Sequence, residues 1–130
     1  MYHGTGINNS ATITAKATEA IANGAFLAAT LSKSGVAIAK AGDTPVGIFI
    51  PETDNIPAGG DTTIQVKDIG LVRVAEAVEP GDLLAAGADG KLVKAAGGAF
   101  ILATALEEAT AADQVISAQI TKAGYVAAAK

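Results

Sequence analysis

The segment Val78-Glu-Pro-Gly-Asp-Leu-Leu-Ala-Ala-Gly-Ala-Asp-Gly-Lys-Leu-Val-Lys94 decides the fold. Pro80 has the φ angle that the first central position of a tight turn requires, and Gly81 tolerates the positive φ of the next position, which predicts a type II turn. Asp89 and Gly90 follow one apolar pair and precede another, which is the strongest short signal for a β-hairpin. The segment therefore predicts a turn, a strand, a second turn and a returning strand.

Short apolar or alternating segments predict further strands on both sides of this hairpin. Polar and apolar side chains alternate most clearly in residues 11–17, 62–67 and 115–121. Turn residues separate the segments at intervals of about 8 to 12 residues. We therefore expect an all-β fold, a compact β-barrel or β-sandwich of short antiparallel strands. The other expected strands are Phe26–Ser32, Val36–Lys40, Pro45–Ile50, Ile69–Val78 and Phe100–Leu106.

The segment Ile69–Val78 is apolar on both faces except at Arg73 and Glu76. A strand with two apolar faces needs cover on both sides. The pattern therefore predicts a strand that is either central in its sheet or covered by another subunit.

One turn pattern recurs along the chain. An apolar residue stands three positions before a glycine in Ile21-Ala-Asn-Gly24, in Ile56-Pro-Ala-Gly59 and in Val78-Glu-Pro-Gly81, and Thr110-Ala-Ala-Asp113 is a weaker version. Because the spacing between these motifs is irregular, we interpret them as repeated turn chemistry and not as a solenoid.

Three regions are predicted along the chain: an N-terminal arm at residues 1–10, a β domain at 11–121 and a C-terminal tail at 122–130. The arm is polar and lacks periodicity. The longest loop within the β domain is Pro51–Gly60, and loops of this length often carry binding functions. Ile56 is the large apolar residue of this loop, and either serves as an exposed anchor or packs back onto the sheet.

Composition excludes several classes of function. The formal net charge is −4 and the isoelectric point is about 4.8, which argues against nucleic-acid binding because that would require a basic face. No apolar run approaches the roughly 20 residues of a membrane span, and no secretion signal is recognisable. The chain is rich in alanine, and each buried CH₂ contributes only about 0.8 kcal/mol, so a partner surface is expected to add stability.

The residues that usually carry catalysis are absent or isolated. Cysteine is missing, and His3 is the only histidine, so neither a catalytic triad nor a histidine or thiolate metal site can form. Most aspartates stand at turns, where their side chains bond the backbone. We therefore expect no enzyme activity, no cofactor and no metal.

The order of motifs between Gly42 and Ile120 is informative as a whole. Gly-Asp-Thr-Pro-Val-Gly-Ile is followed by Ile-Pro-Ala-Gly-Gly-Asp, Ile-Gly-Leu-Val-Arg-Val-Ala, Glu-Pro-Gly-Asp-Leu-Leu with Asp-Gly-Lys-Leu-Val, and Ala-Thr-Ala-Leu-Glu-Glu-Ala. This order resembles the small capsid cement or decoration proteins of tailed bacteriophages. The resemblance implies a compact β-barrel or β-tulip-like domain, often a homotrimer, on the outer capsid surface of the virion. There it would bind at threefold or quasi-threefold positions and clamp adjacent subunits of the major capsid protein.

The extended arm is free to lie across a neighbouring chain as an additional strand. We expect the arm to anchor on the capsid protein, chiefly through Tyr2 and Ile7, with the Pro51–Gly60 loop as the second contact. The expected capsid or subunit contacts are Tyr2, His3, Ile7, Asn8, Asn9, Asp54, Asn55 and Ile56.

Two alternatives from other functional classes remain open. A biotinyl or lipoyl carrier domain would display a modifiable lysine at a hairpin tip, and Lys91 follows Asp89 and Gly90 without the methionine that usually stands beside such a lysine. A fibre or adhesin module would need exposed aromatic side chains, of which this chain has few.

Overall fold

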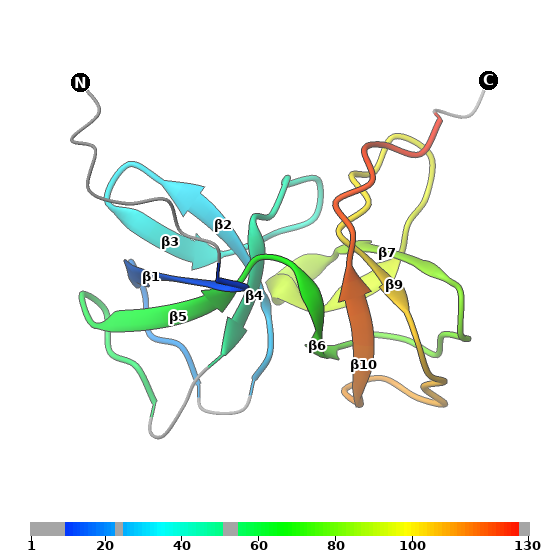
Figure 1. Ribbon diagram of the computed structural model, residues 1–130, viewed down its shortest axis with the longest axis horizontal. Helices are drawn as coiled ribbons and strands as arrows, with labels where there is room; N and C mark the ends of the chain where they lie inside the picture. The colour runs from blue at the N-terminus through cyan, green and yellow to red at the C-terminus, as the bar shows by residue number, and fades with distance from the viewer. Residues whose placement is uncertain (1–9, 23–24, 51–54, 128–130) are drawn as a thin grey trace.

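The computed structural model describes residues 10–22, 25–50 and 55–127, which form two five-stranded antiparallel sheets (Figure 1). The first sheet has the order β1-β5-β4-β2-β3 and the second the order β6-β10-β9-β7-β8. The all-β prediction is confirmed, and the arrangement is a compact sandwich and not a closed barrel. The strands are β1 (Thr12–Lys16), β2 (Ala28–Ser32), β3 (Gly35–Ile38), β4 (Gly47–Ile50), β5 (Asp61–Gln65), β6 (Asp68–Arg73), β7 (Leu83–Ala86), β8 (Leu92–Lys94), β9 (Ala103–Ala105) and β10 (Val115–Ile120).

The predicted hairpin at the centre of the sequence is present. Gly81 has a φ of 92°, and the amide of Asp82 donates to the carbonyl of Glu79 at 3.1 Å, as a tight turn requires. β7 and β8 then pair antiparallel across the short helical turn η1 (Ala88–Gly90). Asp89 and Gly90 both have positive φ, which explains why the sequence uses aspartate and glycine there.

The two sheets are structural repeats of each other. If the five strands of each sheet are numbered one to five in chain order, both sheets have the spatial order 1-5-4-2-3. Strands β6 to β10 are therefore the counterparts of β1 to β5, in that order. The register repeats as well: Ala28 lies opposite Ile48 in the first sheet, and Leu83 lies opposite Thr104 at the same pairing position in the second. We call residues 12–65 the first half and residues 68–120 the second half.

The connections between strands repeat too. Ala17 forms a parallel bridge with Val36 and Ile21 an antiparallel bridge with Ile56; their counterparts are the Val74–Leu92 and Val78–Ala109 bridges. The amides of Gly59 and Asp113 donate to the carbonyls of Ala17 and Val74 respectively, and both donors have positive φ. The recurring turn motifs of the sequence therefore mark equivalent positions of two repeats, which goes beyond repeated turn chemistry.

A pair of equivalent glutamates closes the same edge in each half. Oε2 of Glu19 accepts a hydrogen bond from the amide of Ile38 at 3.0 Å, and Oε2 of Glu76 accepts one from the amide of Lys94 at 2.8 Å. These amides belong to β3 and β8, which are edge strands. The carboxylates satisfy backbone donors that a sheet edge would otherwise leave unpaired.

β4 and the start of β2, at Ala28 and Ala29, are buried on both faces. Ala29 and Phe49 belong to the core of the first half, while Ala28 and Ile48 point the other way and belong to the cluster formed by the second half. Successive side chains of a strand point to opposite faces, so one face of the first sheet closes its own core and the other packs against the second half.

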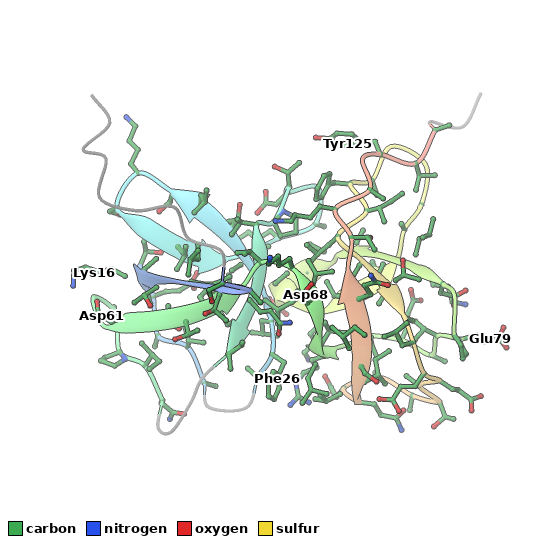
Figure 2. All side chains as sticks on the ribbon, in the orientation of Figure 1. Lys16, Phe26, Asp61, Asp68, Glu79 and Tyr125 are labelled. Carbon is green, nitrogen blue, oxygen red and sulfur yellow. The ribbon has the colours of Figure 1, made fainter. Side chains whose placement is uncertain are left out.

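Polar contacts hold the second half against the first. Nε of Arg73 donates to the carbonyl of Ala25 at 2.9 Å, and Nζ of Lys122 donates to the carbonyl of Val46 at 3.1 Å. Gly90 lies so close to β2 and β3 that a Cβ there would be 2.6 Å from Cγ2 of Ile38. Phe26 also lies between the halves (Figure 2) and packs against the cluster of the second half.

The predicted strand Ile69–Val78 is shorter than expected and is not central. β6 ends at Arg73 and lies at the edge of the second sheet, where it pairs with β10. The strand ends there because Val74 turns away to form its parallel bridge with Leu92. The prediction of a central strand is therefore wrong, and Ile69 is exposed.

The first residues after β10 fold back onto the loop before β9. Phe100 and Tyr125 form an isolated antiparallel bridge, and their rings make an edge contact with centroids 5.4 Å apart. Figure 1 shows this red segment running beside the yellow one. Only Ala103–Ala105 of the predicted strand Phe100–Leu106 pairs as a regular strand, since the residues before it pair with this returning segment.

We predict that Phe49→Ala destabilises the protein by about 3 to 5 kcal/mol, because it removes a fully buried ring from the core of the first half. Urea unfolding monitored by circular dichroism measures the change. The matched control is Leu31→Ala, which changes a side chain that is 63% exposed and should shift the free energy of unfolding by no more than about 0.5 kcal/mol. Equal effects of the two variants would contradict the assignment of this core.

Candidate interaction surface

Most of the predicted contact residues lie outside the described part of the chain. Tyr2, His3, Ile7, Asn8, Asn9 and Asp54 fall in the ranges 1–9 and 51–54, about which the structure gives no description. Asn55 is described and exposed. Contact of these residues with a capsid stays a prediction.

Ile56 has a structural role in the first half. Its amide donates to the carbonyl of Ile21, and the amide of Ile21 donates to the carbonyl of Ile56, both at 2.8 Å. The Ile56 side chain is partly buried and packs against the core that contains Phe49 and Ile64. Of the two interpretations of this residue, the structure favours the one in which it packs back onto the sheet.

Within residues 10–22, 25–50 and 55–127, no three histidine, cysteine, aspartate or glutamate side chains come together as a metal site would require. Several carboxylates accept hydrogen bonds from nearby backbone amides instead: Asp43 from Lys40 and Asp82 from Glu79, both at 2.9 Å. These contacts account for the carboxylates at turns, as the sequence predicted. The same described ranges contain no helix of the length and apolarity needed to cross a membrane.

Two exposed ion pairs lie on the two halves. Nζ of Lys16 is 3.1 Å from Oδ1 of Asp61 across the paired strands β1 and β5, and Figure 2 shows both side chains at the outer end of the first half. On the second half Lys91 pairs with Asp113. Lys91 is the residue that a carrier domain would have to display, so its engagement with Asp113 argues against that alternative.

Asp113 contacts Arg73 at the end of β6 and Lys91 just before β8. Arg73 donates from Nη1 to the Asp113 carbonyl at 2.6 Å, and Lys91 pairs with the Asp113 carboxylate. The hydrogen bond from Lys91, the Lys91 charge and, less strongly, the Arg73 charge hold the pKa of the Asp113 carboxyl below its usual value of 3.8. The carboxylate therefore stays ionised at a lower pH than an unperturbed aspartate would.

A shallow open pocket of about 340 Å³ lies where β3 meets η1, between the two halves. Its wall includes Glu19, whose carboxylate is already bonded to the amide of Ile38. The remaining wall is formed by Ile38, Lys40, Ala41, Ala88 and Asp89. This mixture of three apolar side chains and separate charges offers no convergent set of polar groups for a small ligand.

The outer face of the second sheet carries most of the exposed large hydrophobic side chains of the described chain. Of the six exposed large hydrophobic side chains there, four lie on this face: Ile69, Leu71, Leu83 and Leu106. The register places Ile69 beside Gln119 and Leu71 beside Ser117, while Leu106 donates its amide to the carbonyl of Ser117. We call this the outer face. Polar side chains, among them Ser117, Gln119 and Thr104, lie between its apolar residues.

Sequence reasoning had only one signal for this face, the apolar residues on both sides of the segment Ile69–Val78. The pattern left open whether the strand was central or covered by another subunit. β6 is an edge strand, so it is not central, and its cover by another subunit stays a prediction. Leu83 and Leu106 gave no such signal, since each stands in a segment that also supplies core residues.

The chain has a solved structural counterpart although its sequence matches no known family. No family model matches the sequence, and neither does any curated protein. Among solved structures, the chain is similar to the head fiber gp8.5 N base of bacteriophage phi29, with a TM-score of 0.63 and 20% sequence identity. The similarity covers 87% of this chain and 95% of the phi29 chain. The two proteins share a fold over nearly their whole lengths.

We predict that Asp113→Asn lowers the melting temperature at pH 7 and that this difference from the unmodified protein disappears as the pH falls below 3.8. A carboxyl whose pKa is depressed in the folded state stabilises that state above its unfolded pKa and loses the effect once protonated. Asparagine is the appropriate replacement because Asp113 has a positive φ that asparagine also tolerates. Calorimetry between pH 2 and pH 7 provides the measurement.

The control for this prediction is the same substitution in a Lys91→Met background. There the Asp113→Asn substitution should change the melting temperature at pH 7 by less, because the ion pair is already gone. Added salt should also shrink the effect of the single substitution, since the pair is exposed. A difference that is independent of pH would contradict the assignment.

Proposed function

We propose that this chain is a structural protein of a bacteriophage head that binds the outer surface of the capsid as a cement or decoration protein. The observation that carries the proposal is the fold shared over 87% of the chain with a phage head fiber base. The order of motifs between Gly42 and Ile120 supports the same assignment from the sequence, because it resembles that of phage cement proteins. The two arguments use different properties of the chain and favour the same class of protein.

A cement protein acts by holding neighbouring capsid subunits together. In this proposal the partner is the major capsid protein, and the chain sits as a homotrimer at threefold or quasi-threefold positions of the shell. The arm at residues 1–10 and the Pro51–Gly60 loop make the capsid contacts. The work is mechanical: binding energy on two adjacent subunits resists their separation under the pressure of packaged DNA.

A second function is favoured by one observation. The phi29 protein is named as the base of a head fiber, so this chain is also a candidate for the base on which a fibre stands. A base of this kind would occupy the same outer surface and bind the same partner. The two functions differ in whether binding strengthens the shell.

We predict that the purified chain co-sediments with expanded capsid shells that lack it, and that binding saturates at a copy number in simple proportion to the threefold positions. Deleting residues 1–10 should abolish this binding because the arm carries the expected anchors Tyr2 and Ile7. The melting temperature of the deletion variant serves as the control for its fold. Saturable binding that the deletion leaves unchanged would contradict the role of the arm, and absence of binding by the folded full chain would contradict the proposal.

The same shells distinguish the two functions. A cement protein should raise the temperature or urea concentration at which decorated shells come apart, whereas a fibre base should bind to saturation and leave that threshold unchanged. Light scattering of shells with and without the bound chain measures the threshold.

A further inference from the structure

The two halves differ in what covers equivalent faces of their sheets. In the first half, Ala28 and Ile48 are fully buried because the second half packs over them. Their counterparts by register are Leu83 and Thr104. Leu83 is 43% exposed and Thr104 is partly exposed, so the corresponding face of the second half has no cover within the described chain.

This uncovered face is also more apolar along its edge strand than its equivalent in the first half. Ile69 and Leu71 of β6, which are 62% and 46% exposed, occupy the positions that Thr12 and Thr14 occupy in β1. Threonines are ordinary on a strand facing water, whereas isoleucine and leucine there expose apolar area at a cost in free energy. Because Thr14 is exposed, the second half does not cover this part of the first sheet. A contact equivalent to the junction would therefore cover Leu83 and Thr104 and lie beside Ile69 and Leu71.

The surface that would complement it is open on the first half. The second half covers the first with the side on which Val72 and Ile120 are buried, and it contributes Arg73 and Gly90 to that junction. The counterparts of Val72 and Ile120 are Ala15 and Val66, and both are only partly buried. The outer face of the second half and the open side of the first half are therefore the two surfaces of one kind of contact. That contact already exists once within the chain, between its two halves.

We propose that a second copy of this chain covers the outer face at Leu83 and Thr104. The first half of that copy would pack there in the way that the second half of each chain packs on its own first half. The contact is head to tail, since two different surfaces meet, and repetition of such a contact closes a ring when the rotation between copies permits. The inference rests on the structural repeat and not on capsid binding. It goes beyond the proposed homotrimer by naming the surfaces that join the copies.

Charge is compatible with this contact. Neutral side chains such as Ser117 lie between the apolar residues of the outer face, and the Glu107 carboxylate beside them accepts hydrogen bonds from the Ser117 amide and hydroxyl at 2.6 and 3.0 Å. A carboxylate that is already hydrogen-bonded is less costly to cover than a free one. On the partner, Lys16 occupies the position that Arg73 occupies in the second half. A basic residue at that position already reaches a backbone carbonyl of the covered half within the chain.

The first test is the mass of the protein in solution. Light scattering after gel filtration should give an assembly for the unmodified chain, and the double variant Leu83→Glu, Thr104→Glu should require at least a tenfold higher concentration to assemble. Tyr125→Glu is the matched control, because Tyr125 is 63% exposed and lies outside both halves. Melting temperatures establish that all three proteins fold.

The second test identifies the two surfaces by cross-linking. Ser34 is the counterpart of Gly90, since each lies two positions before the equivalent residues Val36 and Leu92, and Lys94 is the counterpart of Ile38. Because Gly90 touches Ile38 within the chain, Ser34 of one copy should lie against Lys94 of the next. The chain has no cysteine, so Ser34→Cys mixed with Lys94→Cys should give a disulfide-linked pair that neither variant gives alone.

The outcomes separate this inference from the proposed function. Cross-links within a single variant would indicate a twofold contact and overturn the head-to-tail arrangement. A chain that stays monomeric at every concentration, with shell binding lost in the Leu83→Glu, Thr104→Glu variant, would assign the outer face to the capsid and overturn the inference alone. Assembly that persists without any binding to shells would leave the inference standing and contradict the function.

Discussion

The burial of both faces of β4 and of the start of β2 is the constraint on which the rest of the structure depends. A strand covered on both sides leaves little room, so small residues are required where the layers approach each other. Ala28 and Ala29 meet this requirement on opposite faces of β2. At Gly47 in β4 even a methyl group does not fit, since a Cβ would overlap the carbonyl oxygen of Gln65. Each half therefore depends on the other for part of its buried surface.

Local sequence signals predicted the fold class and the turns. The central hairpin, the Glu79–Asp82 turn and the inward positions of β10 are as expected, because period-two alternation and residues that tolerate positive φ act within a few neighbours. The repeat was not predicted, although its turn motifs were visible. Core volume is distributed differently in the two halves: Ala29 and Phe49 of the first correspond to Leu84 and Ala105 of the second. A small core residue in one half thus corresponds to a large one in the other half, and the reverse. This exchange preserves the packing of both cores but removes the sequence similarity between the halves.

The candidate surface was less predictable than the fold, for a physical reason. Exposure depends on which layer packs over a strand, and no periodicity within Ile69–Val78 distinguishes a covered strand from an edge strand that awaits a partner. The exposure of Leu83 could not be predicted for the same reason. Its neighbour Leu84 is fully buried, and two adjacent leucines do not indicate which of them faces the core. The predicted contacts in the arm depend on a partner outside the chain, so they test a binding hypothesis and not the fold.

The link between the halves has a consequence for how their contact is maintained. β5 ends at Gln65 and β6 begins at Asp68, and the Gln65 side-chain amide donates to the carbonyls of Lys67 and Ile69 at 3.0 and 2.9 Å, which fixes the short connection. A short tether holds two surfaces at an effective concentration of the order of millimolar or higher. The junction between the halves therefore persists even if its intrinsic affinity is weak. An equivalent junction between separate chains has no such tether, so its surfaces must bind more strongly. Leu83 would contribute to this, because it stands where the first half has the smaller Ala28.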